Sequence, residues 1–183
     1  MKKAMVLLAI LFATAVGYSQ EFLGIKVEGT RQECINKFKA KGYVVIGTPS
    51  NTAISMRGKA GGNDVDLVIV NTPTSKKVWK FAVFLPERTT WDRLKSDYEY
   101  YVELFTNKIG NPTDIYRNFV SPYYEGDGYE MSAVGIEKCN YIAFWDGIYI
   151  EITKWKQVSV CYENKVNAEI SKKEKDAINS NNF

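Results

Sequence analysis

Cys139-Asn-Tyr-Ile-Ala-Phe-Trp-Asp-Gly-Ile-Tyr-Ile-Glu-Ile-Thr-Lys-Trp155 is the stretch that decides the fold of this chain. Its centre, Asp146-Gly147, supplies the two residues with positive φ that a type I′ turn requires. Such a turn sets the register of the two flanking strands and places Trp145 opposite Ile148. The stretch therefore predicts an antiparallel hairpin.

Alternation along this hairpin separates its side chains into two sets, because successive residues of a strand point to opposite faces. The first set carries no charge and is expected to face the core: Tyr141, Ala143, Trp145, Ile148, Ile150 and Ile152. The second set mixes large aromatic side chains with polar ones: Ile142, Phe144, Tyr149, Glu151, Thr153 and Trp155. The hairpin is thus predicted to have one buried face and one half-solvated face.

A third strand extends the second set. A tight turn near Lys156-Gln157 would place Tyr162 opposite Glu151, with Cys161 on the apolar side. Contiguous exposed aromatic residues are typical of a contact surface. The predicted binding residues are Phe144, Tyr149, Glu151, Thr153, Trp155 and Tyr162, with Val160 beside them. The alternative, that this face is a second core beneath the rest of the molecule, stays open.

The hairpin lies in the second of two successive units, each a helix followed by strands. In the first unit, Thr30 and Glu33 have the spacing of a capping box, and Gly42 stands where a helix would end. Helix is expected over residues 31–41, and alternating or β-branched runs predict strands over 43–48, 52–57, 64–70 and 77–85.

In the second unit, helix is expected from Thr89 or Thr90 to Ile109, with strands over 114–119, 129–136, 139–145, 148–155 and 158–162. A polar helix over 164–178 follows. We therefore predict an α+β fold, in which two successive helix-plus-β-meander units form one antiparallel sheet, with the helices on one face and a C-terminal helix added. Residues 20–163 would form a single domain with halves at 20–86 and 87–163, followed by a polar helix or tail at 164–183. The repeated element order suggests an internal duplication.

A resemblance follows from the segment Phe22-Leu-Gly-Ile-Lys-Val-Glu-Gly-Thr-Arg-Gln-Glu-Cys-Ile-Asn-Lys-Phe-Lys-Ala-Lys-Gly-Tyr43. This segment resembles the opening of uncharacterised secreted proteins of the Bacteroidetes. The tandem order of helix and meander is similar to the β-lactamase-inhibitor-protein-like fold, which implies a sheet face that serves as a protein-binding surface. The matching motif is a helix start and stop, so the resemblance implies no functional residue and no β-lactamase inhibition.

The beginning of the chain predicts export. Met1-Lys2-Lys3 is basic, residues 4–16 are apolar, and Gly17-Tyr18-Ser19 provides the small residues of a cleavage site. The apolar run is shorter than the roughly 20 residues of a membrane span, and no later segment has the composition of one. Residues 1–19 are thus interpreted as a signal peptide cleaved near Ser19/Gln20, and the protein as soluble and either periplasmic or secreted.

Composition excludes several kinds of site. The sequence contains no histidine, so neither a Ser-His-Asp nor a Cys-His nucleophile can form, and the usual zinc sites lose a principal ligand. The net charge of +3 includes Lys2 and Lys3, and without them it is about +1, which gives no electrostatic case for nucleic acid. We therefore expect no cofactor, no metal, no nucleic-acid partner and no enzymatic activity.

Three functions remain to be compared. The first is an interaction module that binds a protein through the aromatic face, and the second is a glycan-binding module in which Phe144, Tyr149 and Trp155 stack on sugars while Glu151 accepts hydroxyl protons. The third is a hydrolase that uses carboxylates alone. It is disfavoured because glycosidases need two acids and this face shows one. Asp64 and Asp66 share a strand face, but alternation on a half-exposed strand explains them. The partner and the oligomeric state stay open.

The cysteines provide a test of the register. Two strand spacings of about 9.6 Å separate Cys139 from Cys161, which exceeds the roughly 7 Å Cα separation that a disulfide allows. A bond between Cys34 and Cys161 stays open, because both are expected on the apolar side.

Overall fold

The computed structural model describes residues 20–180, so the predicted signal peptide at 1–19 lies outside the described residues. The chain forms an antiparallel eight-stranded sheet in the order β3-β4-β5-β6-β10-β9-β8-β7, beside a two-stranded sheet of β1 and β2. The strands are β1 (Glu21–Phe22), β2 (Ile25–Lys26), β3 (Val44–Ile46), β4 (Ala53–Ala60), β5 (Asn63–Asn71), β6 (Val78–Phe84), β7 (Asp114–Phe119), β8 (Cys139–Trp145), β9 (Ile148–Ile152) and β10 (Val158–Glu163). The helices are α1 (Arg31–Ala40), α2 (Trp91–Ile109), α3 (Glu130–Gly135) and α4 (Lys165–Ser180).

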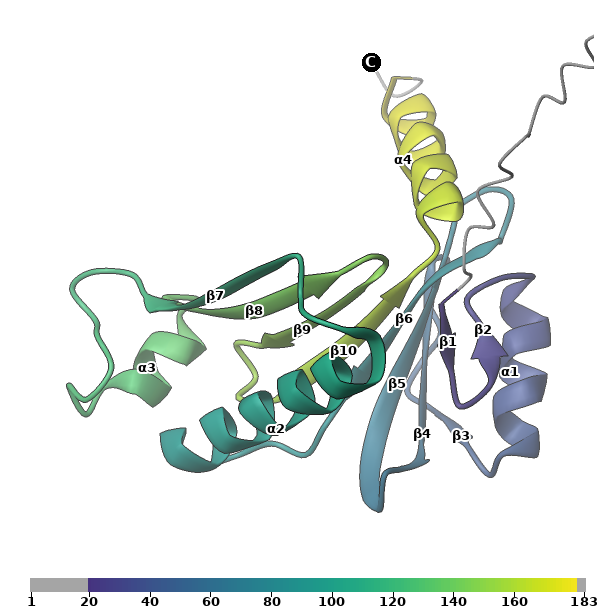
Figure 1. The fold of residues 1–183 in the computed structure, drawn as a ribbon. Helices are drawn as coiled ribbons and strands as arrows, with labels where there is room; N and C mark the ends of the chain where they lie inside the picture. The colour runs from purple at the N-terminus through teal and green to yellow at the C-terminus, as the bar shows by residue number, and fades with distance from the viewer. Residues whose placement is uncertain (1–19, 181–183) are drawn as a thin grey trace, which may run out of the picture.

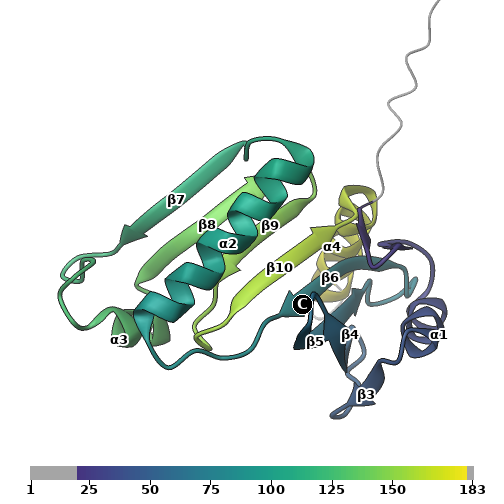
Figure 2. The same cartoon turned by 60° about the horizontal axis from the view of Figure 1, so that its bottom comes forward.

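The sheet consists of two matching halves. In each half a helix precedes four strands, α1 before β3 to β6 and α2 before β7 to β10, and the last strands β6 and β10 pair with each other. Figure 1 shows the strands of the two halves running in different directions, as expected of a strongly twisted sheet. Figure 2 shows α2 lying along one face of β8, β9 and β10. The predicted α+β fold with two helix-plus-meander units and a C-terminal helix is confirmed.

The first helix begins where the sequence predicts. The Thr30 side chain accepts a hydrogen bond from the Glu33 backbone N–H at 3.3 Å, and the Glu33 carboxylate accepts one from the Thr30 N–H at 2.7 Å. Two otherwise unpaired N–H groups are thus satisfied. The helix buries Cys34, Ile35 and Phe38 against the sheet.

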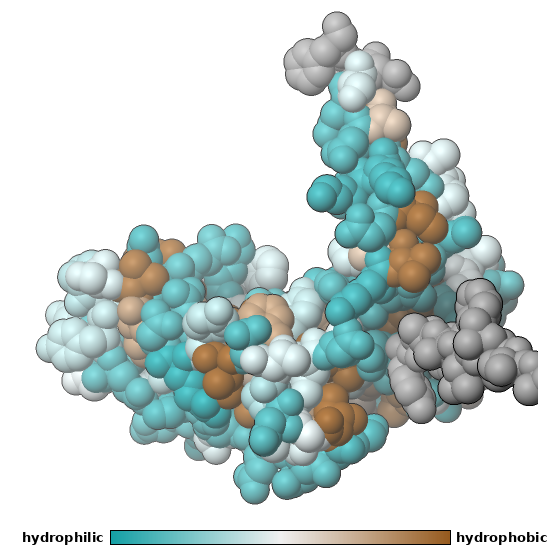
Figure 3. Space-filling view, turned by 45° about the horizontal axis from the view of Figure 1, so that its top comes forward, coloured by the Kyte–Doolittle hydropathy of each residue, from teal (hydrophilic) through white to brown (hydrophobic). Residues whose placement is uncertain are grey.

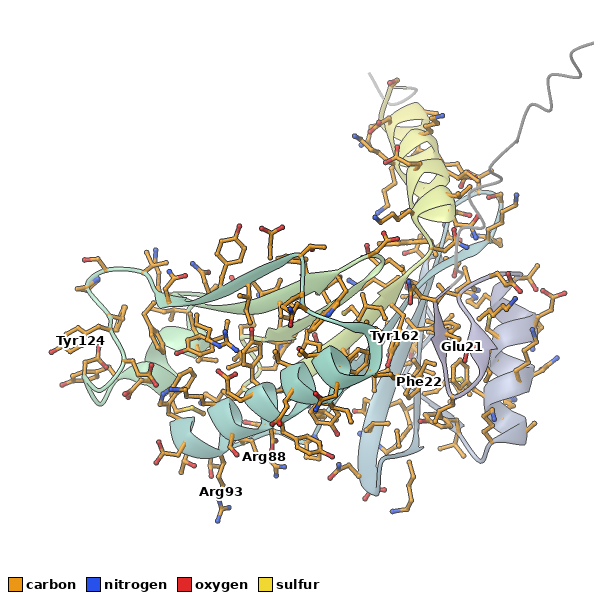
Figure 4. The ribbon with its side chains drawn as sticks, in the orientation of Figure 1. Glu21, Phe22, Arg88, Arg93, Tyr124 and Tyr162 are labelled. Carbon is orange, nitrogen blue, oxygen red and sulfur yellow. The ribbon has the colours of Figure 1, made fainter. Side chains whose placement is uncertain are left out.

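The core is shared by both halves. Tyr162 of β10 has its ring centroid 5.6 Å from that of Phe22 in β1 and 6.2 Å from that of Phe105 in α2. Figure 4 shows Phe22 and Tyr162 close together where the two halves meet. Contacts of this kind join the N-terminal hairpin, the second helix and the central strand into one apolar cluster.

The predicted strand at 129–136 is wrong, because this segment contains α3. Ala133 and Val134 are adjacent and both fully or almost fully buried, at 0% and 2% exposure. Neighbouring residues of a strand point to opposite faces, whereas a helix can bury two in succession. Alternation between Met131 and Ala133 resembles a strand pattern, but Glu, Met and Ala favour helix.

The turn after β9 also differs from the prediction. It spans Thr153 to Gln157, with Lys156 in a left-handed conformation at φ 58, and the Thr153 N–H donates to the Gln157 carbonyl at 2.9 Å. Val160 therefore pairs with Ile150, and Tyr162 with Ile148. This register is three residues away from the predicted one, so every side chain of β10 faces the opposite side.

The C-terminal helix, α4, is attached at its side to the connection between β5 and β6. The Glu174 carboxylate accepts hydrogen bonds from the Thr74 N–H at 2.7 Å and the Ser75 N–H at 3.2 Å, and Asn167 donates to the Val78 carbonyl at 2.8 Å. Figure 1 shows α4 projecting away from the rest of the molecule. Among the described residues, no helix is both long and apolar enough to cross a membrane.

Candidate binding surface

The face of the sheet turned away from α1 and α2 is called the outer face. Its side chains follow from the strand registers and from the alternation of burial in β5, β8 and β9. Figure 3 shows this side of the molecule over β7 to β10, where apolar residues lie among hydrophilic ones. The central outer-face residues are Lys80 and Phe84 of β6, Tyr116 of β7, Ile142 and Phe144 of β8, Tyr149 and Glu151 of β9, and Ser159, Cys161 and Glu163 of β10.

Four of the six predicted binding residues belong to this region. Phe144, Tyr149 and Glu151 lie on the outer face and are half-buried. Trp155 lies in the turn after β9 instead of in a strand, and it is 60% exposed. It stays beside the outer face because its ring meets that of Phe84 edge-on at 6.2 Å. A fully buried second core is therefore not what this surface forms.

The other two predicted binding residues lie elsewhere. Tyr162 is on the core side, where it contacts Phe22, because the register of β10 differs from the predicted one. Thr153 is 8% exposed, and its hydroxyl donates to the Gln157 carbonyl at 3.1 Å within the turn. Val160, predicted beside them, is also in the core. These three residues cannot contact a ligand on the outer face.

The rings of the outer face support one another. Tyr116 of the edge strand β7 meets Phe144 edge-on with centroids 6.4 Å apart, and Phe144 lies 6.0 Å from Tyr149 at an interplanar angle of 37°. Edge-to-face pairs are favoured by the quadrupoles of the rings. Tyr116 is 50% exposed. These three rings are inclined to one another and form an uneven surface, and the exposed ring, that of Tyr116, lies at the sheet edge.

A buried polar group lies beside this row. Lys80 donates a hydrogen bond to the Tyr149 hydroxyl, and its ammonium lies 3.7 Å from the Glu163 carboxylate. Side-chain exposures of 18% for Lys80 and 29% for Glu163 show that this ion pair is mostly shielded from water. Burial raises the pKa of Tyr149, so its phenol stays protonated and can serve a ligand as a neutral hydrogen-bonding group.

The surroundings of Glu151 shift the pKa of its carboxyl group. Burial raises its pKa, while the Ser159 hydroxyl, which donates to it at 3.2 Å, and the charge of Lys80 act in the opposite direction. Ser159 also lies 3.8 Å from the Cys161 sulfur. Burial likewise raises the pKa of the Cys161 thiol, so this cysteine is not an activated nucleophile.

The corrected register brings Glu163 onto the same face as Glu151. Ser159 is the partner of Glu151 on β10, and Glu163 lies four residues further, about 13 Å along the strand. The charge of Glu163 contributes to the raised pKa of Glu151, so the two carboxylates interact across this part of the face. Among residues 20–180, no group of three or more His, Cys, Asp or Glu side chains is arranged to hold a metal ion.

Asp64 and Asp66, which share a strand face, and Glu125 of a loop all have structural partners. Asp66 forms a bidentate ion pair with Arg57, which donates hydrogen bonds at 2.7 and 2.9 Å, and Asp64 accepts a hydrogen bond from Lys59 at 2.9 Å. In the loop after β7, the Glu125 carboxylate accepts hydrogen bonds from Lys95, from the Tyr141 hydroxyl at 3.0 Å and from the Trp91 indole at 3.4 Å. The Glu125 side chain thus ties the loop to α2 and β8.

Sequence reasoning misses several members of the outer face. Lys80 and Phe84 are there because β6 pairs with β10, a contact between distant parts of the chain. Tyr116 carries a usable signal, because its strand is predicted and pairs with the adjacent β8. Cys161 lies on the outer face and not on the apolar side that the predicted turn implies.

All three cysteines are free, and Cys34 and Cys161 lie on opposite sides of the sheet. The disulfide between them that the sequence left open is therefore not formed. No protein-family model, curated protein or solved structure matches this chain. The resemblances drawn from the sequence thus stay predictions.

Proposed function

We propose that this protein is a non-catalytic binding module that contacts a protein partner through its outer face. The observation that carries the proposal is the pairing of exposed aromatic ends with a buried polar centre. Tyr116 and Trp155 are 50% and 60% exposed at two places on this surface. Glu151 is half-buried in the cross-strand row that runs from Tyr116 to Phe84, and the Lys80 side chain, 18% exposed, lies beside Tyr149. Aromatic anchors around desolvated charges are typical of protein interfaces.

The proposed contact residues are Phe144, Tyr149, Glu151 and Trp155 from the sequence, with Tyr116 and Lys80 added from the structure. Their rings hold one another in place, so little side-chain entropy is lost when a partner binds. Lys80 is held by Tyr149 and Glu163 before any partner arrives. Preorganisation of this kind favours affinity.

Glycan binding is the second candidate, with Phe144, Tyr149 and Trp155 as stacking rings and Glu151 as hydroxyl acceptor. The ring geometry favours a protein partner over a sugar. Phe144 and Tyr149 are inclined at 37° to each other and do not form one flat platform, and Lys154 lies 5.5 Å from the centroid of Trp155.

Export remains part of the proposal. It rests on the basic, apolar and small-residue order of residues 1–19. Intact mass of the protein recovered from its producing cell should correspond to a chain that begins at Gln20 or Glu21. A retained Met1 would contradict export.

Site-specific photocrosslinking tests the outer face directly. A photoreactive phenylalanine analogue at Trp155 should yield a discrete crosslinked protein in the producing cell. The matched control carries the analogue at Tyr124, an exposed loop residue (65%) labelled in Figure 4. Equal crosslinking at both positions would indicate random collision and would overturn the proposal. A glycan array with the wild type and Trp155→Ala addresses the second candidate.

A further inference from the structure

The hairpin of β4 and β5 extends beyond the strand that flanks it. β5 begins at Asn63, but its last pair with β6 joins Asp66 to Phe84. Residues 63–65 thus pair with β4 on one side and lie past the end of the β5–β6 ladder on the other. We call this part of β5 the overhang.

After Phe84 of β6 the chain no longer pairs with β5, because it continues alongside β10. The Leu85 N–H donates to the Val158 carbonyl at 3.0 Å, and the Gln157 side chain donates to the Leu85 carbonyl at 3.0 Å. Pro86 follows, and it has no backbone N–H that could donate a hydrogen bond to β5. The overhang and the Leu85-Pro86 segment therefore diverge.

The alternation of hydrogen-bonded pairs identifies the backbone N–H and C=O groups of the overhang that point into the space between it and the Leu85-Pro86 segment. Gly61 and Gly62, at φ 55 and 82, form a two-residue turn that closes on the Ala60 and Asn63 pair. In an antiparallel ladder, hydrogen-bonded and non-hydrogen-bonded pairs alternate. Asp64 is therefore the residue of the overhang whose N–H and C=O point away from β4, as on a free sheet edge.

A pocket lies on each side of the overhang. The first, of about 550 Å³, is on the outer side and is lined by Arg57, Asp64, Asp66 and Phe84. The second, of about 270 Å³, is on the α2 side, and its lining includes Arg88, Tyr100, Tyr101 and Leu104. Figure 4 labels Arg88 next to α2. Both pockets include Asn63, Leu85 and Pro86 in their linings.

The two pockets differ in chemistry. Two aspartates and one arginine line the first. The Asp64 and Lys59 side chains that form an ion pair at its rim are 74% and 76% exposed, so a cation from a ligand can replace Lys59 at little cost. In the second pocket, Tyr100 and Leu104 are large apolar residues that are 59% and 44% exposed.

We infer that the overhang binds an extended peptide as an added strand. Successive side chains of a strand point to opposite faces, so a peptide paired with Asp64 would direct alternate residues into the two pockets. The charge of the first pocket suits a basic side chain, and the second suits an aromatic or aliphatic one. The partner is thus a segment in which basic and apolar residues alternate. This inference does not rest on the proposed function of the outer face.

A matched pair of variants isolates the backbone contact. Asp64→Pro and Asp64→Ala both remove the carboxylate, but only proline also removes the N–H that points away from β4. Proline is tolerated on an edge strand whose N–H faces solvent. Circular dichroism and melting of the two variants establish that the hairpin still folds.

The probe is a phage-displayed library of random dodecapeptides, selected on the protein. Enriched peptides should alternate basic and apolar residues, and they should bind Asp64→Pro about tenfold more weakly than Asp64→Ala, as expected for one lost backbone hydrogen bond. Tyr100→Ala should also weaken them, whereas Tyr116→Ala, on the outer face, should leave their affinity unchanged.

Three results would overturn the inference: no enriched peptide, enriched peptides without alternation, or equal affinity for the two Asp64 variants. If Asp64→Pro fails to fold, an unchanged affinity for Tyr100→Ala overturns it equally well. Failure of the outer-face proposal would instead show as absent crosslinking at Trp155.

Discussion

The ring of Tyr43 lies directly over Gly58 of β4, so close that a Cβ built on this glycine would be 2.5 Å from the ring carbons. The Tyr43 hydroxyl reaches past it to donate to the Lys59 carbonyl at 3.2 Å. Tyr43 is 2% exposed. Gly58 therefore belongs to a strand, where the absence of a side chain makes room for a core ring.

Gly58→Ala should destabilise the fold by about 1 to 3 kcal/mol, because the added methyl group overpacks a rigid, buried ring. Gly135→Ala is the matched control. A Cβ added to Gly135, at the end of α3, would meet nothing within 4 Å, and this glycine has no positive φ, so alanine there should be neutral or stabilising. Urea unfolding of both variants checks this, and equal losses would contradict the packing argument.

Ile150→Ala and Trp155→Ala compare the two sides of the sheet. Ile150 is fully buried, so its truncation should cost about 2 to 5 kcal/mol through lost burial and a residual cavity. Trp155 is 60% exposed, and its removal should cost about 1 kcal/mol or less in folding. Thermal or denaturant melts measure both. Similar losses for the two variants would place Trp155 in the core.

Glu151→Gln should stabilise the protein at neutral pH. Burial raises the pKa of Glu151 above its ordinary value of 4.5, so the folded state holds this proton more tightly than the unfolded state does. The carboxyl group therefore favours folding below that value, and the contribution is lost as the pH rises through the folded pKa. Glutamine removes the cost of burying a charge. The gain of Glu151→Gln over the wild type should shrink as the pH falls through the raised folded pKa towards 4.5, and a gain that grows in acid would contradict the assignment.

Glu125→Gln should have the opposite pH profile. Lys95 above all, and also Tyr141 and Trp91, lower the pKa of Glu125 from 4.5. A carboxylate with a lowered pKa contributes stability above its unfolded pKa, and this is lost as the pH falls through the folded value. The variant should thus be less stable than the wild type at neutral pH and equal to it in strong acid. Melting curves at several pH values test this, and a loss that persists in acid would show that the charge is not responsible.

The native protein should react slowly with iodoacetamide. Burial raises the pKa of Cys34 to about 11 and that of Cys139 to about 12, and it raises the pKa of Cys161 as well. Little thiolate is therefore present near neutral pH. Mass spectrometry should find three free thiols, labelled quickly only after unfolding. A bond between Cys34 and Cys161 would contradict the positions of these residues on opposite sides of the sheet.

Local signals in the sequence predict the local structure well. The capping box at Thr30, the register set at Asp146-Gly147 and the length of α2 each depend on neighbours within a few residues, and the structure confirms all three. The predicted type I′ turn is wrong, because only Gly147 of the two turn residues has a positive φ, at 71. The turn after β9 escapes prediction because its left-handed residue is Lys156, which carries no glycine or asparagine signal. That single turn is why Tyr162 is predicted on the wrong face.

Contacts between distant segments account for the rest of the missed surface. Neither the pairing of β6 with β10 nor the end of the β5–β6 ladder can be derived from alternation within one strand. Lys80 therefore joins Tyr149, and the overhang of β5 arises, through topology alone. The predicted site contains the right hairpin but only part of its surroundings.

The pairing of β6 with β10 affects the tendency of this chain to aggregate. Each half ends in a strand that, alone, would be an open edge: six of seven residues of β6 are apolar, and five of six residues of β10 are buried. When β6 and β10 pair, each covers the open edge of the other, and the outer edges left are the three-residue β3 and the largely exposed β7. Either half produced separately is expected to self-associate through its last strand. The two-fold arrangement of a single chain is thus also its protection against aggregation.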